Sequence, residues 1–239
     1  MATLYLIRHG QAGSRDNYDV LSTLGERQAR LLGAHLAEQQ IAWRAMYAGE
    51  LFRQQQTARL VCDAIRERYL SLPELVTDER WNEFSLADVY RGMAPRLLLD
   101  DDDFARDYEE MQQLLIADPH ATRGAAGRCD RAVIEAWMED RYPSYEGESW
   151  ESFRQRVQSS LEDLKTYGKG ENVAVFTSAT PIAIWVGAAL ELSPARILRL
   201  MAVLYNASIT TIKLWQEEPV LLNFNTTPHL LDVSVRTFR

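Results

Sequence analysis

The sequence predicts an α/β protein: a three-layer α/β/α sandwich with a mainly parallel sheet and a helical lid insertion. Three observations support this class. Short apolar runs such as Thr3–Ile7 and Asn172–Thr177 are typical of strands buried on both faces of a sheet. Segments with helical periodicity alternate with these runs, and such alternation favours parallel strands covered by helices on both sides. Two β-rich runs near the C-terminus, Ser208–Trp215 and Val220–Asn225, predict a terminal hairpin.

The N-terminal part of the chain alternates between strand and helix. After the strand at Thr3–Ile7, leucines recur at helical spacing over Thr23–Glu38, where Thr23 and Glu26 fit a capping box. The same patterns predict a strand at Trp43–Ala48, a helix at Glu50–Tyr69 and a short strand at Leu75–Thr77. These residues therefore supply three strands of the expected sheet.

The regular pattern breaks down between about Asn82 and Tyr145. Four aspartates at Asp100–Asp103 predict a solvated loop, a helix is expected near Phe104–Ile116, and Gly124–Gly127 predicts a Gly/Ala-rich loop. The stretch is too long for an ordinary connection between two elements. We therefore expect one domain spanning residues 1–239, with a lid insertion at about 82–145.

Helical and strand patterns return after the lid. The expected elements are a helix at Trp150–Tyr167, the strand at Asn172–Thr177, a helix running to Leu190 and a helix near Ser193–Val203. The third of these would open with Thr180 as its cap and Pro181 in its first turn. The terminal hairpin then completes the sheet.

Composition and charge exclude several classes of protein. The 239 residues include 26 Lys and Arg against 34 Asp and Glu, a formal net charge of −8. Broad nucleic-acid binding needs a basic face, so we expect no nucleic-acid partner. No apolar run reaches about 18 residues and the N-terminus lacks a signal-peptide pattern, so we expect no membrane partner. Cys62 and Cys129 lack metal-ligand spacing, which predicts two free thiols in a cytoplasmic protein.

The residues that follow the predicted strands carry most of the chemistry. They are Arg8-His9-Gly10, Glu50–Arg53, Arg80–Glu83 and Ser178–Thr180. In sheets of this kind ligands bind outside the carboxyl ends of the strands, so these groups should converge. Arginine forks and helix N–H groups bind phosphate oxygens, histidine supplies a nucleophile or base, and glutamate supplies a proton. The sequence therefore predicts a phosphate site.

Five segments with this chemistry occur in a recognisable order. They are Leu6–Gln11, Leu21–Ala29, Leu51–Ala58, Asn82–Phe84 and Glu146–Ser149, which read LIRHGQ, LSTLGERQA, LFRQQQTA, NEF and EGES. In this order the chain resembles the histidine phosphatase superfamily, which includes the cofactor-dependent phosphoglycerate mutases. The resemblance covers roughly residues 3–83 and 144–230.

The resemblance implies a role for each matching residue. His9 would be the nucleophile that becomes phosphohistidine, and Glu83 would protonate the leaving oxygen and then activate water. Arg8 and Arg53 would clamp the phosphate, with Arg15 as an extra contact. Because the two arginines neutralise the charge of the transferring group, we expect neither a metal nor another cofactor.

The chain departs from the family pattern at one position. After the strand Asn172–Thr177 the family usually carries a second histidine followed by glycine, whereas this chain has Ser178 and Ala179. Losing one donor of this kind typically lowers the rate about 100- to 1,000-fold, although Ser178 can still donate a neutral hydrogen bond to the phosphate. No other histidine fits the gap, because His35 lies inside a helix, His120 in the lid and His229 after the last strand.

These residues predict a metal-independent phosphatase acting on phosphomonoesters through phosphorylated His9. An impaired protein that only binds a phosphate ligand is the alternative. Gln11–Leu21 lacks the Glu-Trp-Asn pattern with which mutases hold their substrate, so a mutase is disfavoured. The substrate would be a small phosphorylated molecule or a phosphoprotein, selected by the lid, and the terminal hairpin could support a homodimer.

Overall fold

The computed structural model describes residues 2–14, 17–68, 71–118, 121, 123–215 and 218–238. By their contacts the residues form two compact units. The first unit contains Met1–Gly13, Asn17–Glu83 and Arg156–Arg239, and the second contains Ser14–Asp16 and Phe84–Gln155. The boundary at residue 155 falls within a helix.

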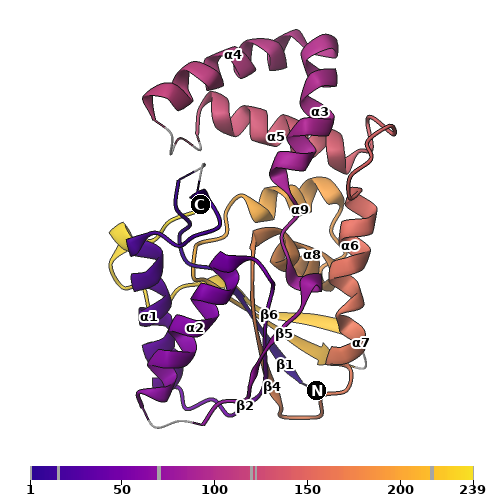
Figure 1. The fold of residues 1–239 in the computed structure, drawn as a ribbon. Helices are drawn as coiled ribbons and strands as arrows, with labels where there is room; N and C mark the ends of the chain where they lie inside the picture. The colour runs from indigo at the N-terminus through magenta and orange to yellow at the C-terminus, as the bar shows by residue number, and fades with distance from the viewer. Residues whose placement is uncertain are drawn as a thin grey trace. The chain divides into compact units, whose positions relative to one another are not determined.

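Six strands in the described part of the first unit form one sheet (Figure 1). They are β1 (Thr3–Arg8), β2 (Trp43–Ala48), β3 (Leu75–Thr77), β4 (Asn172–Thr177), β5 (Ile209–Trp215) and β6 (Glu218–Thr226), in the order β3-β2-β4-β1-β5-β6. The pairs β3–β2, β2–β4 and β4–β1 are parallel, whereas β1–β5 and β5–β6 are antiparallel. The sheet is therefore mainly parallel and ends in the expected hairpin.

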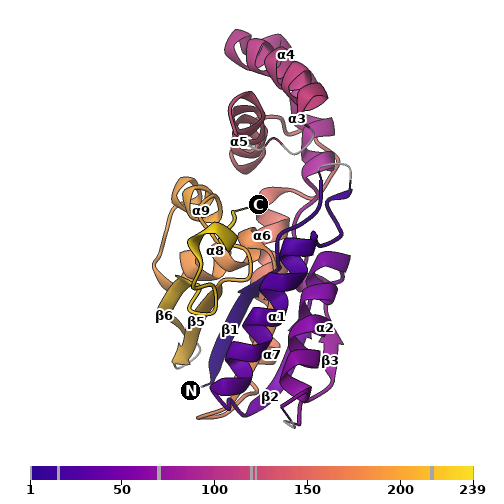
Figure 2. The same ribbon diagram turned by 90° about the vertical axis from the view of Figure 1, so that its left-hand side faces the viewer.

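Helices cover both faces of this sheet. Helices α1 (Thr23–Glu38) and α2 (Phe52–Arg66) pack against each other on one face, the side from which Figure 2 is viewed. Helix α8 (Ala179–Ala189) lies on the opposite face, where it contacts β1 and β6 and is followed by α9 (Pro194–Met201). The predicted α/β class is thus confirmed, with layers of helix, sheet and helix.

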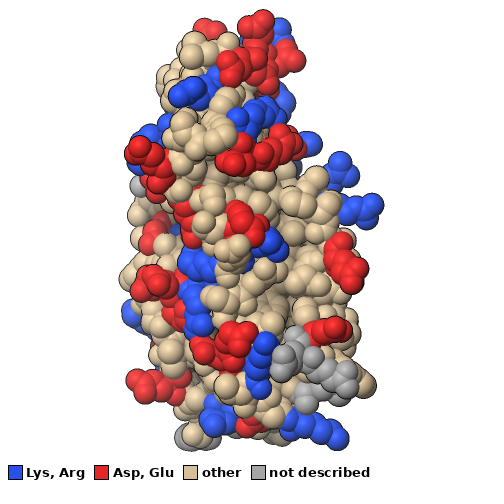
Figure 3. All heavy atoms as spheres, turned by 90° about the vertical axis from the view of Figure 1, so that its right-hand side faces the viewer, with Lys and Arg blue, Asp and Glu red and all other residues tan. Residues whose placement is uncertain are grey.

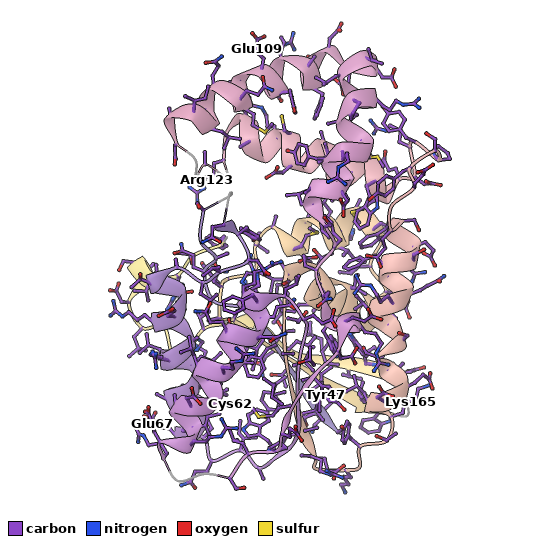
Figure 4. The ribbon with its side chains drawn as sticks, in the orientation of Figure 1. Tyr47, Cys62, Glu67, Glu109, Arg123 and Lys165 are labelled. Carbon is purple, nitrogen blue, oxygen red and sulfur yellow. The ribbon has the colours of Figure 1, made fainter. Side chains whose placement is uncertain are left out.

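The core between the sheet and α1–α2 is apolar and contains one of the two cysteines. Cys62, labelled in Figure 4, has its Sγ 3.8 Å from Sδ of Met46 on β2. Burial raises the pKa of this thiol to about 11, so it stays protonated at neutral pH. Cys129 is also buried, and neither cysteine forms a disulfide, as the sequence predicted.

The ends of several helices differ from the sequence prediction. The N-cap of α1 is Ser22, whose Oγ accepts from Gly25 N at 3.0 Å, so the capping box assigned to Thr23 and Glu26 is wrong. Helix α8 begins at Ala179 with Ser178 as its N-cap residue, two residues before the expected cap, Thr180. Apart from Thr180, the side chains of α8 are apolar, so its sequence shows no polar face that would indicate how the helix is oriented.

The helix predicted at Trp150–Tyr167 is two helices, α6 (Trp150–Ser159) and α7 (Leu161–Leu164). Between them, Ser160 donates from Oγ to Val157 O at 2.6 Å. A serine that bonds back to the preceding turn in this way bends a helix.

On the face of the molecule in Figure 3, acidic and basic side chains are interspersed.

The second unit is more helical than its sequence suggested. Its described residues form α3 (Leu86–Asp100), α4 (Asp102–Ala117) and α5 (Ala125–Met138), of which only α4 was expected. The loop predicted at Asp100–Asp103 is instead a tight junction, where Asp101 caps α4 by accepting from Phe104 N at 2.9 Å. The predicted Gly124–Gly127 loop is also wrong, because α5 begins immediately after Gly124.

Helix α3 was not predicted from the sequence, because it contains Gly92 and Pro95, two residues that normally end a helix. Gly92 has a packing reason, since a Cβ there would collide with the ring of Tyr145. An aromatic cluster of Phe84, Trp137, Trp150 and Phe153, with ring centroids 4.7–6.0 Å apart, forms part of this unit's core. The role of this unit as a lid stays a prediction.

Among the described residues, no helix has both the length and the apolar character needed to cross a membrane.

Candidate active site

The centre of the candidate site is His9, the residue that follows β1. Its N–H donates to Thr177 O at 2.9 Å, and its carbonyl accepts from Ala207 N at 3.1 Å and from Asn206 Nδ2 at 3.3 Å. The β1–β4 register pairs Arg8 with Thr177, so His9 and the residue after β4 lie side by side at the carboxyl edge. The His9 backbone is therefore anchored by β4 on one side and by residues just before β5 on the other, and His9 is only 1% exposed.

The imidazole of His9 is held in one tautomer. Nδ1 lies 2.7 Å from Gly10 O, and because a carbonyl only accepts, Nδ1 carries the hydrogen. Nε2 then has a lone pair and accepts from Arg53 Nε at 3.3 Å. Burial, followed by the positive charges of Arg53 and Arg8, holds the pKa of His9 well below the usual 6.5. The structure thus presents a neutral imidazole whose Nε2 can act as a nucleophile.

The backbone around His9 depends on two glycines that touch. A Cβ on Gly10 would come within 2.9 Å of the carbonyl carbon of Gly25, and a Cβ on Gly25 within 2.8 Å of Gln11 N. Gln28 fixes this contact, because its Oε1 accepts from Gln11 N at 2.8 Å and its Nε2 donates to Val235 O at 2.7 Å. The segment after β1 is therefore tied to the start of α1 and to the C-terminal residues.

Two buried guanidinium groups belong to the same site. Arg8 is 4% exposed and donates from Nη1 to Leu204 O, while its buried Nε has no partner among the residues that the structure describes. Burial lowers the pKa of Arg8, although a guanidinium keeps its proton at neutral pH. Arg53 is 6% exposed, and its guanidinium lies over the ring of Tyr18 at 4.9 Å from the centroid. Two buried cations beside a neutral histidine favour an anionic ligand.

Asp19 positions Arg53 and was not found by sequence reasoning. Its Oδ1 lies 2.9 Å from Arg53 Nη1, and its two carboxylate oxygens accept from the backbone N–H groups of Phe52 and Arg53 at 3.1 and 3.4 Å. Asp19 therefore caps α2 from a distant loop. The one sequence signal was Leu51, an apolar residue at the N-cap position of α2 that cannot accept these hydrogen bonds.

Glu83 lies where the sequence placed it, near the start of α8. It follows a 3₁₀ turn at Glu79–Trp81, is half-buried, and accepts from Thr180 N through Oε2 at 3.1 Å. Its negative charge also acts on Arg8 and raises that residue's pKa, against the larger lowering effect of burial. The Thr180 amide, expected as a phosphate donor, is thus already occupied by Glu83.

Ser178 is fully buried next to His9. Its Oγ accepts from Gln54 Nε2 at 2.8 Å, and the same Nε2 donates to Trp81 O at 3.1 Å. Gln54, which follows Arg53 in the first turn of α2, was not singled out in the sequence. It is completely buried, and its contact with Ser178 joins the ends of β4 and α2.

The remaining arginines expected at the site, and the histidines judged not to fit it, have different surroundings or lie outside the described residues. Arg80 forms ion pairs with Asp78 and Asp163, so its charge is neutralised locally. Arg15, expected to contact phosphate, lies outside the residues that the structure describes, as does His120. His35 and His229 lie near each other, with ring centroids 6.1 Å apart.

Comparisons with known proteins agree with this arrangement. The sequence model of the histidine phosphatase superfamily (branch 1) matches residues 4–135 and 120–227. Among curated protein sequences, none matches the chain.

Solved structures share the fold at low sequence identity. A phosphoserine phosphatase mutant from Entamoeba histolytica, in complex with phosphoserine, has a TM-score of 0.62 and 18% identity over 97% of this chain and 100% of its own. A phosphoglycerate mutase from Bacillus anthracis has a TM-score of 0.60 and 19% identity over 96% of this chain and 95% of its own. A mycobacterial glucosyl-3-phosphoglycerate phosphatase, in complex with VO3, has a TM-score of 0.61 and 20% identity over 94% and 99%.

Proposed function

The chain belongs to the histidine phosphatase superfamily, and we propose that it is a metal-independent phosphatase that hydrolyses phosphomonoesters through a phosphohistidine on His9. One observation carries this proposal. A neutral, buried imidazole whose Nε2 accepts from Arg53 shares its site with a second buried guanidinium, that of Arg8, whose Nε has no hydrogen-bond partner among the described residues. The structures with the same fold include phosphatases and a mutase, which supports phosphate-ester chemistry in general.

The first step transfers the phosphoryl group to His9. Arg8 and Arg53 bind the phosphate oxygens and offset the charge that develops during transfer. As phosphorus approaches, Arg53 Nε turns from Nε2 of His9 to a phosphate oxygen. The bond from Nε2 to phosphorus forms, the bond from phosphorus to the ester oxygen breaks, and a protonated Glu83 gives its proton to that oxygen. The Thr180 amide orients the Glu83 carboxyl group for this transfer.

The second step hydrolyses the phosphohistidine. Glu83, now a carboxylate, takes a proton from water as the water oxygen attacks phosphorus. The bond between phosphorus and Nε2 breaks, inorganic phosphate leaves, and His9 is again neutral with its hydrogen on Nδ1. Ser178 donates a hydrogen bond to the phosphate in both steps. No metal takes part in these two reaction steps. The substrate is a small phosphorylated molecule or a phosphoprotein.

A second function is a protein that binds a phosphate ligand without turnover. The observation that favours it is Ser178, because a neutral hydroxyl is a weaker donor to a phosphate than a protonated imidazole. Such a protein would keep Arg8, Arg53 and the anion site. A mutase is the least favoured function, since the loop after His9 lacks the mutase pattern.

Hydrolysis of para-nitrophenyl phosphate by wild type, His9→Ala and His35→Ala tests the proposal. We expect turnover in wild type that survives a chelator, is lost in His9→Ala and is kept in His35→Ala. Equal turnover in His9→Ala would overturn the phosphohistidine mechanism. If wild type is inert towards this and other phosphate esters, but orthovanadate raises its melting temperature, the binding function replaces the phosphatase.

A further inference from the structure

Gln54 occupies a position that structural stability does not explain. Its side chain is fully buried in the first turn of α2, and its Oε1 has no hydrogen-bond partner among the described residues. A buried acceptor without a donor destabilises a folded protein, so most such groups have partners. The amide also requires a glycine beside it, because a Cβ on Gly49 would collide with Oε1.

The orientation of the Gln54 amide follows from its neighbours. Nε2 lies 3.1 Å from Trp81 O and 2.8 Å from Ser178 Oγ. A backbone carbonyl only accepts, so the nitrogen end of the amide must face Trp81. The reverse orientation would put two acceptor oxygens in contact. Gln54 therefore donates to Ser178, and the Ser178 hydroxyl uses a lone pair in this bond.

This bond determines what the Ser178 hydroxyl can do. With its oxygen accepting from Gln54, the hydroxyl hydrogen must point to another group, and none of the described residues accepts a hydrogen bond from it. The β1–β4 register places Ser178 beside His9, where the phosphate would bind. The hydrogen is therefore available to a phosphate oxygen.

We infer that Gln54 is a positioning residue that turns the Ser178 hydroxyl into a fixed donor towards the phosphoryl group on His9. This inference rests on the proposed function and deepens it. Gln54 does not touch the substrate. It acts through Ser178: the Gln54 amide donates to the hydroxyl oxygen, and the hydroxyl donates to the phosphate. This relay adds a neutral donor to the charged guanidinium donors of the site.

A double-mutant cycle separates this role from a structural one. The four proteins are wild type, Gln54→Met, Ser178→Ala and the double variant, assayed with para-nitrophenyl phosphate. We expect Gln54→Met to lower kcat about tenfold with little change in KM, because a flexible hydroxyl donates less well. In the Ser178→Ala background the same change should alter kcat by no more than about twofold. Ser178→Thr keeps the hydroxyl and should keep the dependence on Gln54.

Folding is expected to survive Gln54→Met. Trp81 O keeps its second donor, Thr177 Oγ1, at 2.6 Å, and the substitution removes the unpartnered Oε1. A melting temperature close to that of wild type would show that lost kcat is not lost folding. An equal kcat loss in both backgrounds, or no loss in either, would overturn the inference.

Orthovanadate binding supplies a second measurement that does not need turnover. The apparent affinity for orthovanadate, from the shift in melting temperature, is measured for the same four proteins. Coupling between Gln54 and Ser178 in this affinity supports the inference even if wild type hydrolyses nothing, and its absence overturns it. The proposed function fails separately, through equal hydrolysis by His9→Ala or the lack of any turnover.

Discussion

Arg53 donates its Nε hydrogen to Nε2 of His9 across 3.3 Å. The nitrogen proposed to attack phosphorus is thus covered, in the absence of phosphate, by the guanidinium proposed to bind the phosphate. Because this cation sits against the imidazole, protonation of His9 is opposed by like charge as well as by burial. The same contact therefore favours the neutral form of His9, and in the proposed mechanism it marks where the phosphate would bind.

The first prediction concerns the pH dependence of hydrolysis. Since the pKa of His9 is held well below 6.5, its protonation should not reduce kcat/KM between pH 7 and pH 6. Replacing Arg53 with Gln removes the second-largest cause of the shift, so the acidic limb of the profile should move to higher pH. Profiles of kcat/KM with one aryl phosphate check this, because the substrate's own ionisation is common to all variants.

Arg59→Gln is the matched control for this profile. Arg59 lies on the same helix, is exposed, and donates to Gln55. We expect its profile to overlay that of wild type. An unmoved acidic limb in Arg53→Gln would show that the Arg53 charge does not act on His9.

A second prediction concerns Asp19, which caps α2 and pairs with Arg53. Replacing Asp19 with Ala leaves two N–H groups of α2 without their acceptor, and we expect the free energy of unfolding to fall by about 1 kcal/mol. KM for an aryl phosphate should rise, because Arg53 loses the anchor of its Nη1. Urea denaturation and steady-state kinetics measure the two effects.

The control for Asp19 is Asp63→Ala, at the opposite end of α2. Asp63 pairs with Arg66 on the surface at 3.4 Å, and both side chains are more than half exposed. Exposed pairs of this kind contribute little to stability. Equal destabilisation by the two variants would argue against a special role for Asp19.

The sequence predicted most strands and helix α1 closely, but it missed helices α3 and α5 of the second unit. The bounds of β2, β3 and β4 agree with the prediction at both ends, because short runs of aromatic, β-branched and other apolar residues favour strands. The positions of His9, Glu83 and Ser178 followed directly, since strand ends determine which residues share an edge. Helix α3 was hidden by Gly92 and Pro95, whose local preference the packing of the helix overrides.

The supporting residues of the site could not be predicted in the same way. Asp19 acts on a helix that begins 33 residues later, and Gln54 acts on a hydroxyl 124 residues away. Neither contact can be recognised from a hydrophobic period or a motif spacing in the sequence. The only sequence features that point to them are Leu51, which cannot cap the start of α2, and a polar residue, Gln54, on a buried face of that helix.

A third prediction concerns the leaving group. If Glu83 protonates the ester oxygen, Glu83→Gln should lower kcat/KM for an alkyl phosphate about 100-fold or more. It should lower kcat/KM for para-nitrophenyl phosphate much less, because nitrophenolate leaves without a proton and the later hydrolysis of the phosphohistidine does not enter kcat/KM. The Gln side chain retains an oxygen that can accept from Thr180 N, so the start of α8 should stay intact.

Parallel kinetics with glycerol phosphate and para-nitrophenyl phosphate test this prediction. The control is Glu79→Gln, because Glu79 is an exposed carboxylate four residues before Glu83. This variant should behave as wild type with both esters. A Glu83→Gln variant whose kcat/KM falls equally for both esters would indicate that Glu83 does not act as the acid.

The last prediction concerns stability in acid and depends on His229. This residue is 8% exposed, and burial, followed by the charge of His35, lowers its pKa to about 4. Its folded pKa lies below the unfolded value of 6.5, so the unfolded chain binds more protons between these values. The stabilisation is therefore complete above about pH 6.5 and is lost as the pH falls towards 4.

Between pH 7 and pH 4.5 this one group should remove about 2 kcal/mol of the free energy of unfolding. The His9 imidazole, also buried and neutral, acts in the same direction, so wild type alone does not isolate His229. His229→Asn cannot titrate, and although it is less stable at pH 7 it should lose about 2 kcal/mol less than wild type on acidification. Chemical denaturation of both proteins at the two pH values measures the difference, and parallel losses would mean that His229 is not buried in its neutral form.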